Sequence, residues 1–244
     1  MYRDYDPFAW LFAHHWGQDY HRQVIPALER LILRLLPPDA AILDLCCGDG
    51  RIAAALAGRG FRVTGLDGSE QMLRYARQAA PDVRFVHADA REFSLATSFD
   101  AVISTFDSLN HVESSRELKA VFLNVFKALN SGGYFGFDLN REQAYIELWT
   151  EMTGTVAEGA VSVAKSTYDA RREVATCAIT EFRKVNGEWQ RSDYRLTQKH
   201  HPHDRVMAGL EAAGFQSIAS FDAIDDLRMK GPTGQHRTFY LARK

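Results

Sequence analysis

Two hydrophobic patterns alternate along the chain between residues 41 and 140. Short apolar runs predict buried strands, which lie at 41–45, 61–66, 83–87, 99–104 and 134–139. Between these runs, apolar residues recur at helical spacing, and the predicted helices lie around 24–36, 52–57, 72–80 and 118–129. This alternation predicts an α/β fold, in which helices cover both faces of a doubly wound, mostly parallel sheet.

The pattern changes after Arg141. A short helix around 144–149 precedes about 45 residues that alternate as antiparallel strands do. The α/β pattern then resumes with a helix that begins at Pro202 and is capped by Gly214, followed by strands at 215–221 and 238–242. The middle segment therefore reads as an antiparallel β insertion into a single domain.

One dipeptide inside the insertion fixes a register. Asn186-Gly187 predicts a two-residue type I′ hairpin, because both central positions of that turn need positive φ. The predicted hairpin pairs Lys184 with Trp189 and Phe182 with Arg191. An arginine across from an aromatic ring indicates a cation–π contact.

Composition and charge narrow the function. Lys and Arg number 29 against 31 Asp and Glu, and the formal charge of -2 argues against a surface that neutralises nucleic-acid phosphates. No apolar run reaches the roughly 18 residues of a membrane span, and the first residues lack the order of a signal peptide. Cys46, Cys47 and Cys177 give neither a disulfide framework nor the spacing of a zinc site. We expect a cytoplasmic protein with reduced thiols that acts on a small molecule, away from nucleic acid and membrane.

Acidic residues and glycines gather where the predicted strands end. Asp44 precedes a turn with Gly48 and Gly50, where a ligand can approach the backbone and a helix N-terminus points at it. Asp67 ends the second strand and Asp89 ends the third. A carboxylate after the second strand can accept both ribose hydroxyls, and one after the third can accept the exocyclic amine of adenine. Together they indicate a site for adenosine.

The order of these parts resembles the class I methyltransferases that use S-adenosylmethionine. The resemblance covers roughly residues 40–140 and the last two strands. Its motifs are Leu43-Asp44-Leu45-Cys46-Cys47-Gly48-Asp49-Gly50, Gly65-Leu66-Asp67-Gly68-Ser69, His87-Ala88-Asp89, Phe99-Asp100-Ala101-Val102 and Leu129-Asn130-Ser131-Gly132-Gly133. It implies a Rossmann-like methyltransferase fold with an antiparallel last strand, S-adenosylmethionine as cofactor and S-adenosylhomocysteine as product.

The same resemblance implies roles for individual residues. Gly48 and Gly50 would line the methionine portion, Asp67 would bind ribose, Met72 would pack on adenine, and Asp89 with the Ala90 amide would read the adenine edge. The whole cofactor-binding set that we expect is Tyr20, Asp44, Cys46, Gly48, Gly50, Asp67, Gly68, Met72, Asp89, Ala90 and Thr105. Cys46 stands where this family usually has glycine, so we expect it to avoid the φ values that suit glycine.

Two further segments resemble the amino-sugar N-methyltransferases and related small-molecule enzymes. They are Gln18-Asp19-Tyr20-His21 and Phe106-Asp107-Ser108-Leu109-Asn110-His111-Val112. The resemblance implies that Tyr20 lies near the methionine carboxylate and that His111 faces the substrate amine. If a proton has to be removed, His111 is the first candidate, with Asp107 or Tyr5 behind it. We expect N-methylation of an amine, with O-methylation left open.

The chain is expected to divide into three functional parts. Residues 1–38 form a helical lid with aromatic side chains, residues 39–140 and 201–244 bind the cofactor, and residues 141–200 form the inserted β cap. The insertion either covers the substrate pocket or joins two copies in a homodimer, since both uses give the same alternation.

Alternative interpretations stay open. Gly48-x-Gly50-x-x-Ala53, with Asp67 further on, formally fits an NAD(P)-dependent oxidoreductase, although Asp44 stands where those folds usually have an apolar residue. A third interpretation is a module that binds the cofactor without turnover. The segment His200-His201-Pro202-His203-Asp204 suggests a metal, but it begins a helix and lacks partners at known spacing. We expect no metal, and instead expect Lys199, His200 or His201 to line the pocket.

Overall fold

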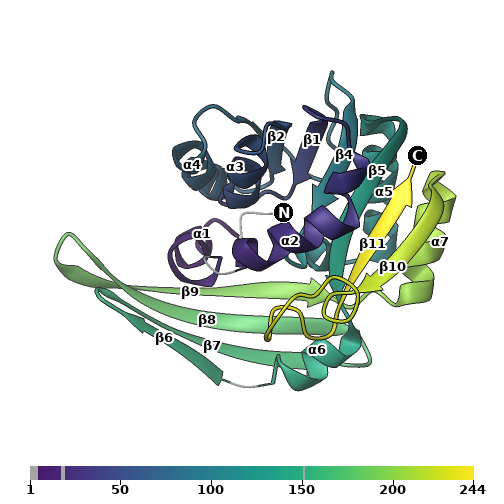
Figure 1. Ribbon diagram of the computed structural model, residues 1–244. Coiled ribbons are helices and arrows are strands. Elements are labelled where there is room, and N and C mark those ends of the chain that lie inside the picture. Colours follow the sequence, from purple (N-terminus) through teal and green to yellow (C-terminus); the bar gives the residue numbers. More distant parts are fainter. Residues whose placement is uncertain (1–4, 18–19, 151) are drawn as a thin grey trace.

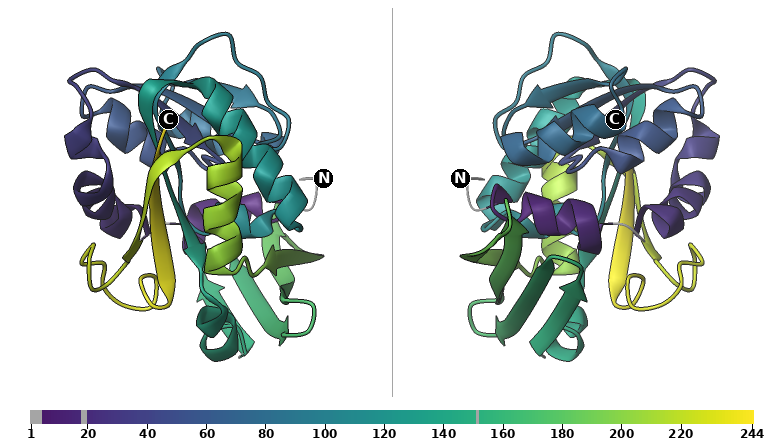
Figure 2. Two further views of the ribbon diagram at one scale, coloured as in Figure 1. Left: turned by 90° about the vertical axis from the view of Figure 1, so that its right-hand side faces the viewer. Right: turned by 90° about the vertical axis from the view of Figure 1, so that its left-hand side faces the viewer.

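A computed structural model describes residues 5–17, 20–150 and 152–244 of the chain. Two sheets lie on either side of the N-terminal helices (Figure 1), and Figure 2 shows the same arrangement from both sides. The larger sheet has the strand order β10-β11-β5-β4-β1-β2-β3. Its strands are β1 (Ala41–Leu45), β2 (Arg62–Asp67), β3 (Arg84–His87), β4 (Phe99–Ser104), β5 (Leu129–Asn140), β10 (Gln216–Asp222) and β11 (Arg237–Arg243).

Strand directions in this sheet agree with the prediction. β1 pairs in parallel with β2 and with β4, so Asp44 lies between Gly65 and Ile103. β5 is parallel to β4, whereas β11 is antiparallel to both β5 and β10. The predicted doubly wound, mostly parallel sheet with an antiparallel last strand is confirmed. The carboxyl ends of β1, β2 and β4 meet at one edge, which is where ligands bind in such sheets.

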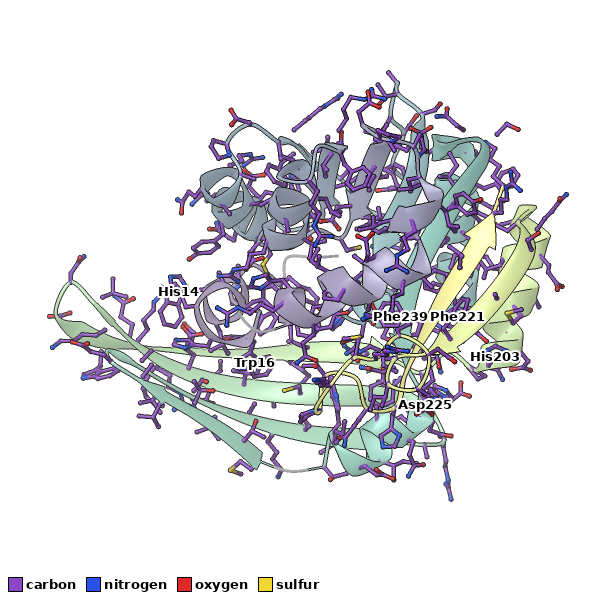
Figure 3. All side chains as sticks on the ribbon, in the orientation of Figure 1. His14, Trp16, His203, Phe221, Asp225 and Phe239 are labelled. Atoms are coloured by element: carbon purple, nitrogen blue, oxygen red, sulfur yellow. The ribbon has the colours of Figure 1, made fainter. Side chains whose placement is uncertain are left out.

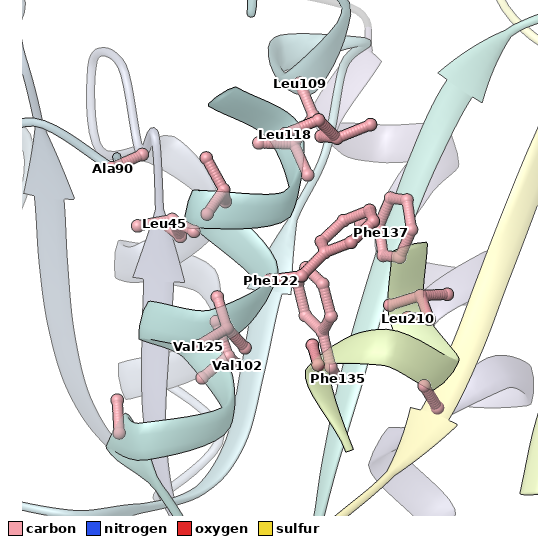
Figure 4. Packing of buried hydrophobic residues seen from close by; sticks show 14 of the residues in the cluster. Leu45, Ala90, Val102, Leu109, Leu118, Phe122, Val125, Phe135, Phe137 and Leu210 are labelled. Atoms are coloured by element: carbon pink, nitrogen blue, oxygen red, sulfur yellow. The ribbon is translucent and has the colours of Figure 1, made fainter. Parts of the chain in front are cut away.

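Helices bury apolar residues on both faces of the larger sheet. On one face, α5 (Ser115–Ala128) and α7 (His203–Ala213) pack over β4 and β5, and Phe122 stands among Phe135, Phe137 and Leu210 (Figure 4). On the opposite face, α2 (Tyr20–Leu31) and α3 (Arg51–Ala57) bury Leu28 and Leu56 in a second cluster. α4 (Glu70–Ala79) follows β2 and is capped by Ser69, which accepts a hydrogen bond from the Met72 backbone. The two apolar clusters hold the strands of the larger sheet in place from both of its faces.

The first long helix differs from its prediction. The apolar spacing predicts one helix over 24–36, but α2 ends at Leu31 and a separate 3-10 turn, η3 (Leu33–Leu35), follows. Ile32 leaves the helical conformation at φ -139° and is fully buried. The chain therefore bends where it anchors Ile32 in the core, before Pro37 could stop a continuous helix.

The insertion forms a second, four-stranded antiparallel sheet. Its strands follow one another as β6 (Met152–Ala157), β7 (Ala160–Asp169), β8 (Val174–Val185) and β9 (Glu188–Lys199), and α6 (Glu142–Glu147) connects them to β5. Asn186 and Gly187 have φ values of 52° and 91°, as the predicted turn requires. Lys184 pairs with Trp189, and Phe182 pairs with Arg191, whose guanidinium lies 5.9 Å from the Phe182 ring centre. The predicted hairpin and its cation–π contact are confirmed.

The N-terminal segment packs between the two sheets. It consists of α1 (Ala9–Leu11) and a π-helical turn, η2 (Phe12–Trp16), and Phe8 and Leu11 are buried against Leu196 of β9 and Met72 of α4. Figure 3 shows His14 and Trp16 above the long strands of the second sheet. This packing places aromatic side chains directly over the carboxyl edge of the larger sheet. Within the described residues, no helix is long and apolar enough to cross a membrane.

Candidate active site

A cavity of about 360 Å³ opens at the carboxyl edge of the larger sheet, beneath the N-terminal segment. Its volume is within the usual range for small-molecule sites. All three predicted catalytic residues, Tyr5, Asp107 and His111, line it. Eight predicted cofactor residues do so as well: Tyr20, Asp44, Cys46, Gly48, Asp67, Gly68, Met72 and Thr105. Gln18 and Asp19 of the predicted N-terminal motif lie outside the described residues.

The second sheet forms the opposite wall. Each of its strands contributes to the cavity, through Thr153 of β6, Ala164 and Ser166 of β7, Cys177 of β8, and Leu196 and Gln198 of β9. These side chains are small or apolar except at the Gln198 end. The cavity therefore has an apolar side and one polar corner, where Gln198 meets Asp107 and His111.

The turn after β1 is held by backbone conformations that only some residues adopt readily. Gly48 has φ 53°, and its N–H donates to Asp67 Oδ2 at 2.8 Å. The Ser69 N–H donates to the other carboxylate oxygen, also at 2.8 Å. Cys46 has φ 60°, so the expectation that it avoids the left-handed region is wrong. A non-glycine residue held there costs energy that the surrounding packing has to supply, which is typical of functional turns.

Asp44 is buried without a full set of partners. The residue is 2% exposed, and its Oδ2 finds no hydrogen-bond partner among the described residues. Burial raises the pKa of Asp44 to about 8, the charge of Asp67 adds to the rise, and a hydrogen bond from the Ala53 backbone opposes it. A buried acceptor without a donor is costly unless a ligand provides one. The ammonium group of S-adenosylmethionine is such a donor, so the part of the cavity beside Asp44 fits the expected cofactor.

Asp67 is suited to a ligand with hydroxyl groups. Each of its carboxylate oxygens already accepts one backbone hydrogen bond and retains a further lone pair. Burial raises the pKa of Asp67 to about 6, against the two backbone hydrogen bonds that lower it. Met72 is buried beside this residue at the start of α4. Both residues line the cavity, and their roles toward ribose and adenine stay predictions.

Three predicted cofactor residues, Gly50, Asp89 and Ala90, are outside the lining of the cavity. At Gly50, with φ 76°, an added Cβ would lie 2.7 Å from the Ala76 Cβ and 2.8 Å from the Ala76 Cα. Gly50 therefore allows α3 and α4 to approach each other. Asp89 accepts several hydrogen bonds from Arg91, the shortest of them 2.6 Å from Arg91 Nη2, while Ala90 is buried in the core beneath.

His111 is fixed in one neutral form by its neighbours. It ends the 3-10 turn η4 (Ser108–His111), and its Nδ1 lies 2.8 Å from the carbonyl oxygen of Thr197 and also contacts the Tyr5 hydroxyl. A carbonyl only accepts, so Nδ1 carries the proton and Nε2 keeps its lone pair. Burial lowers the pKa of His111, although Asp107 opposes this. The ring is therefore neutral near pH 7 and able to accept a proton at Nε2.

Gln198 was not predicted, and it completes this corner. Its Nε2 lies 3.0 Å from His111 Nε2 and also donates to Asp107 Oδ2, while its Oε1 accepts from the Tyr145 hydroxyl at 2.9 Å and from Asn140 Nδ2 at 3.3 Å. Every hydrogen-bonding position of the amide is used. The sequence signal was weak, because Gln198 is one polar residue in an alternating strand.

A buried ion-pair network supports the same corner, and sequence reasoning missed most of it. Arg237 Nη2 donates to Asp107 Oδ1 at 2.7 Å, and Nη1 contacts the Asp138 carboxylate. Asp138 also accepts hydrogen bonds from the backbones of Phe106 and Asp107, at 2.8 and 2.9 Å. A carboxylate inside the apolar strand 134–139 was the available signal, since buried charges require partners.

Tyr20 belongs to this network rather than standing free in the cavity. Its hydroxyl donates to Asp138 Oδ1 at 3.3 Å and accepts from the Phe106 N–H at 3.0 Å. Burial raises the pKa of Tyr20 well above its usual value, so it stays neutral. Phe106 and Asp107 have φ values of 64° and 49°, and two successive non-glycine residues in the left-handed region mark a strained turn.

The histidine-rich segment lies elsewhere. Lys199, His200 and His201 do not line this cavity, so that expectation is wrong. The Lys199 ammonium pairs with Glu173 at 2.9 Å, and His201 Nε2 contacts the Val112 carbonyl at 2.9 Å. The partners of Lys199 and His201 therefore lie outside the lining of this cavity. Across residues 5–17, 20–150 and 152–244, no group of three His, Cys, Asp or Glu side chains could hold a metal ion.

Comparison with known proteins agrees with this geometry. Residues 42–133 match a family model described as a methyltransferase domain. "Putative methyltransferase YqeM" of Bacillus subtilis (strain 168) is 32% identical over 186 residues, 74% of this chain and 75% of that protein. The dTDP-3-amino-3,6-dideoxy-alpha-D-glucopyranose N,N-dimethyltransferase of Streptomyces fradiae is 33% identical over 165 residues, 66% of this chain and 62% of that protein.

A solved structure shows the same fold. S-adenosylmethionine-bound CalS10, an amino pentose methyltransferase from Micromonospora echinaspora, superposes with a TM-score of 0.74 at 23% identity, over 93% of this chain and 92% of that one. The strand order, the acidic residues at the strand ends and these matches lead to one assignment. The chain belongs to the class I S-adenosylmethionine-dependent methyltransferases, with S-adenosylmethionine as its cofactor.

Proposed function

We propose that the protein transfers the methyl group to the nitrogen of an amine on a small molecule. The observation that carries this proposal is the convergence of two hydrogen-bond acceptors, Asp107 Oδ2 and His111 Nε2, on one nitrogen, Gln198 Nε2. A primary or secondary ammonium offers two or three N–H groups to such a pair, whereas a hydroxyl offers one O–H. An alcohol in the same place would leave one buried acceptor without a donor, at a cost of about 1–3 kcal/mol.

The charge of the corner favours the same class of acceptor. Asp107 and Asp138 carry two negative charges against the single positive charge of Arg237, and all three side chains are buried. Asp107 lines the cavity, while Asp138 lies behind it. The unbalanced negative charge therefore faces the cavity through Asp107, where a substrate ammonium would compensate it.

The residues of the chain account for the steps that the reaction needs. When bound, the cofactor supplies an activated methyl group on a sulfonium; Asp44 and Asp67 would hold it. Asp107 binds the acceptor ammonium, and His111 Nε2 accepts its proton, which frees the nitrogen lone pair for in-line attack. The N-terminal aromatic residues Phe8, Phe12 and Trp16 cover the cavity and exclude water. We therefore propose that the segment 1–38 is the lid of the cavity and that the insertion 141–200 is its cap, as the sequence predicts.

An amino sugar is the acceptor that we favour. Two relatives are named for action on an amino-dideoxyglucopyranose and on an amino pentose. In this chain, the small and apolar wall formed by Ala164, Cys177 and Leu196 leaves room for a ring beside the polar corner. A cyclic amine would place its ring against this wall and its nitrogen at Asp107.

A matched panel tests the proposal. Purified protein with S-adenosylmethionine is incubated with nucleoside-diphosphate amino sugars and with simple pairs such as cyclohexylamine and cyclohexanol, and products are identified by mass spectrometry and NMR. We expect N-methylated products from amines, and loss of this activity in Asp107→Asn with cofactor binding retained. Methylation of the alcohols in preference to the amines would overturn the proposal.

We also propose that two copies associate through the outer face of the second sheet. Val156 is 83% exposed, Met152 66% and Trp189 56%, so apolar side chains lie in water on this face. Val156, Val161 and Phe182 stand opposite one another across β6, β7 and β8, which makes the apolar positions continuous. Light scattering on the wild type and on Val156→Lys tests this proposal, since the variant should be monomeric.

A further inference from the structure

The end of β9 is hydrogen-bonded to the turn η4 through three successive residues. The Thr197 carbonyl accepts from His111 Nδ1 at 2.8 Å, the Gln198 amide meets His111 Nε2 at 3.0 Å, and the Lys199 carbonyl accepts from Asn110 Nδ2 at 2.9 Å. Both nitrogens of the imidazole ring are thus contacted by the second sheet. β9 therefore determines which ring nitrogen of His111 carries the proton.

The orientation of the Gln198 amide follows from its partners. Its NH₂ group faces two acceptors, Asp107 and His111, and its carbonyl faces two donors, the hydroxyl of Tyr145 and the NH₂ of Asn140. A flipped amide would place its oxygen against the Asp107 carboxylate and its NH₂ against that of Asn140. Gln198 is 2% exposed, so these four partners rather than bulk solvent satisfy its amide.

This arrangement conflicts with proton transfer to His111 while Gln198 stays in place. A neutral imidazole has one lone pair, at Nε2 here, and the Gln198 N–H already occupies it. The same NH₂ group occupies Asp107 Oδ2. Asp107 Oδ2 has a second lone pair, but an acceptor nitrogen that gives its proton to His111 needs the position at Nε2 that the amide holds.

We propose that Gln198 is a positioning residue whose amide occupies the place of the acceptor nitrogen and is exchanged for it when the amine binds. The proposal rests on the proposed function, because it takes His111 as the group that receives the proton. With no acceptor bound, the Gln198 NH₂ group donates to both Asp107 and His111, and His111 Nε2 carries no proton. On exchange, the amine takes over both hydrogen bonds, and the methylation site forms only when an N–H donor of the right geometry is present.

The test uses three variants of the full chain. Gln198→Met has similar length without the amide, and Gln198→Glu keeps an acceptor for Tyr145 and Asn140 if the methionine variant folds poorly. Gln190→Met is the matched control, since Gln190 is an exposed glutamine on the same strand. Thermal unfolding identifies variants that have lost the fold.

The first readout is steady-state kinetics with the amine. We expect Gln198→Met to lower the KM for the amine about fivefold, the equivalent of one net hydrogen bond that no longer has to be exchanged, with kcat changed less than threefold. A purely structural role would lower kcat or stability without lowering KM. An unchanged or raised KM in a folded Gln198→Met protein would overturn the proposal, whereas Gln190→Met should match the wild type.

The second readout needs no turnover, so it separates this proposal from the proposed function. Nitrogen-15 NMR follows the Gln198 NH₂ and the His111 ring in the complex with S-adenosylhomocysteine. Cyclohexylamine should shift both sets of signals, and cyclohexanol should leave them unchanged. The groups that face His111 are Tyr5, Asp107 and, through Asp107, Arg237, so the His111 titration is compared in all variants.

The expected titration has a definite sign. A donor on the Nε2 lone pair favours the neutral ring, so Gln198→Met should raise the His111 pKa and move the acidic limb of kcat/KM with it. Gln198→Glu should raise it further, because a carboxylate favours the imidazolium. If the wild type fails to methylate any amine, the proposed function is wrong; if it methylates amines but the Gln198 signals do not respond to cyclohexylamine, this inference is wrong.

Discussion

Arg237 Nη2 donates a hydrogen bond to Asp107 Oδ1 at 2.7 Å, which joins the last strand of the chain to the turn after β4. The same guanidinium contacts Asp138, and it lies 5.4 Å from the centre of the Tyr20 ring. Burial raises the pKa of Asp138, and the positive charge of Arg237 opposes this rise. The position of Asp107 in the cavity therefore depends on a residue 130 positions further along the chain.

Replacing Arg237 by Met should destabilise the fold strongly. The change leaves Asp107 and Asp138 as buried carboxylates without a cation, and breaking a buried pair in this way typically costs about 3–5 kcal/mol. Urea unfolding of Arg237→Met gives the free energy of unfolding directly. Arg243→Met is the control, because the Arg243 side chain is exposed. Adding Asp138→Asn to Arg237→Met should recover part of the loss; equal stabilities of Arg237→Met and the control would contradict the network.

Replacing His111 by Ala should slow methyl transfer without loss of the cofactor. General base catalysis typically contributes 10² to 10⁴ in rate, so we expect kcat to fall by at least about a hundredfold. The His111 ring lies at the polar corner beside Gln198, whereas the expected cofactor residues Asp44 and Asp67 belong to the ends of β1 and β2. Calorimetric titration with S-adenosylhomocysteine should give a dissociation constant within about twofold of the wild type. An equal loss of cofactor affinity would remove His111 from the acceptor corner.

Cofactor affinity should rise with pH between about 6 and 7.5 because of Asp44. The pKa of Asp44 is raised to about 8 by burial and by Asp67, so the free protein holds a proton that the cofactor ammonium must displace. Linkage then gives an increase of up to about tenfold in affinity per pH unit below the pKa. Titrations across this range measure the slope. Asp44→Asn should bind more weakly with no such slope, and a steep slope in that variant would assign the proton to another group.

The same carboxyl makes the ligand-free protein less stable as the pH rises from 3.8 to about 8. The pKa of Asp44 is about 8 in the folded state against 3.8 for the free side chain, so folding is favoured where the group is protonated. This contribution is fully present below pH 3.8 and is lost as the pH rises to about 8. Asp44→Asn mimics the protonated carboxyl, so it should raise the melting temperature by several degrees at about pH 8, by less near pH 5 and by little below pH 3.8. No gain near pH 8 would show that Asp44 has a normal pKa.

The sequence predicts local features better than long-range ones, for a physical reason. Asp44 and Asp67 were predicted because each lies at the end of its own strand, where the apolar pattern and the turn are read together. Gln198 and Arg237 were missed because their roles depend on how the second sheet and β11 pack against the turn at 106–111. Cys46 was judged by the preference of its residue type, but the surrounding packing holds it at φ 60°. Tertiary contacts determine the conformations and partners of all three residues. The hydrophobic periodicity of the sequence carries no information about such contacts.

Gly48 and Gly50 belong to one sequence motif but should fail in different ways when changed to alanine. At Gly50 the added Cβ would lie 2.8 Å from the Ala76 backbone, so Gly50→Ala forces α3 and α4 apart and should lower the melting temperature by several degrees. At Gly48 the nearest atom is 3.4 Å away on the Phe12 ring, which can move, and the residue lines the cavity. Gly48→Ala should therefore fold with a smaller loss, from its φ of 53°, and bind S-adenosylhomocysteine at least about tenfold more weakly. Melting curves and calorimetric titrations on both variants separate the two roles. Weak cofactor binding by a Gly50→Ala protein of normal stability would return Gly50 to the cofactor site.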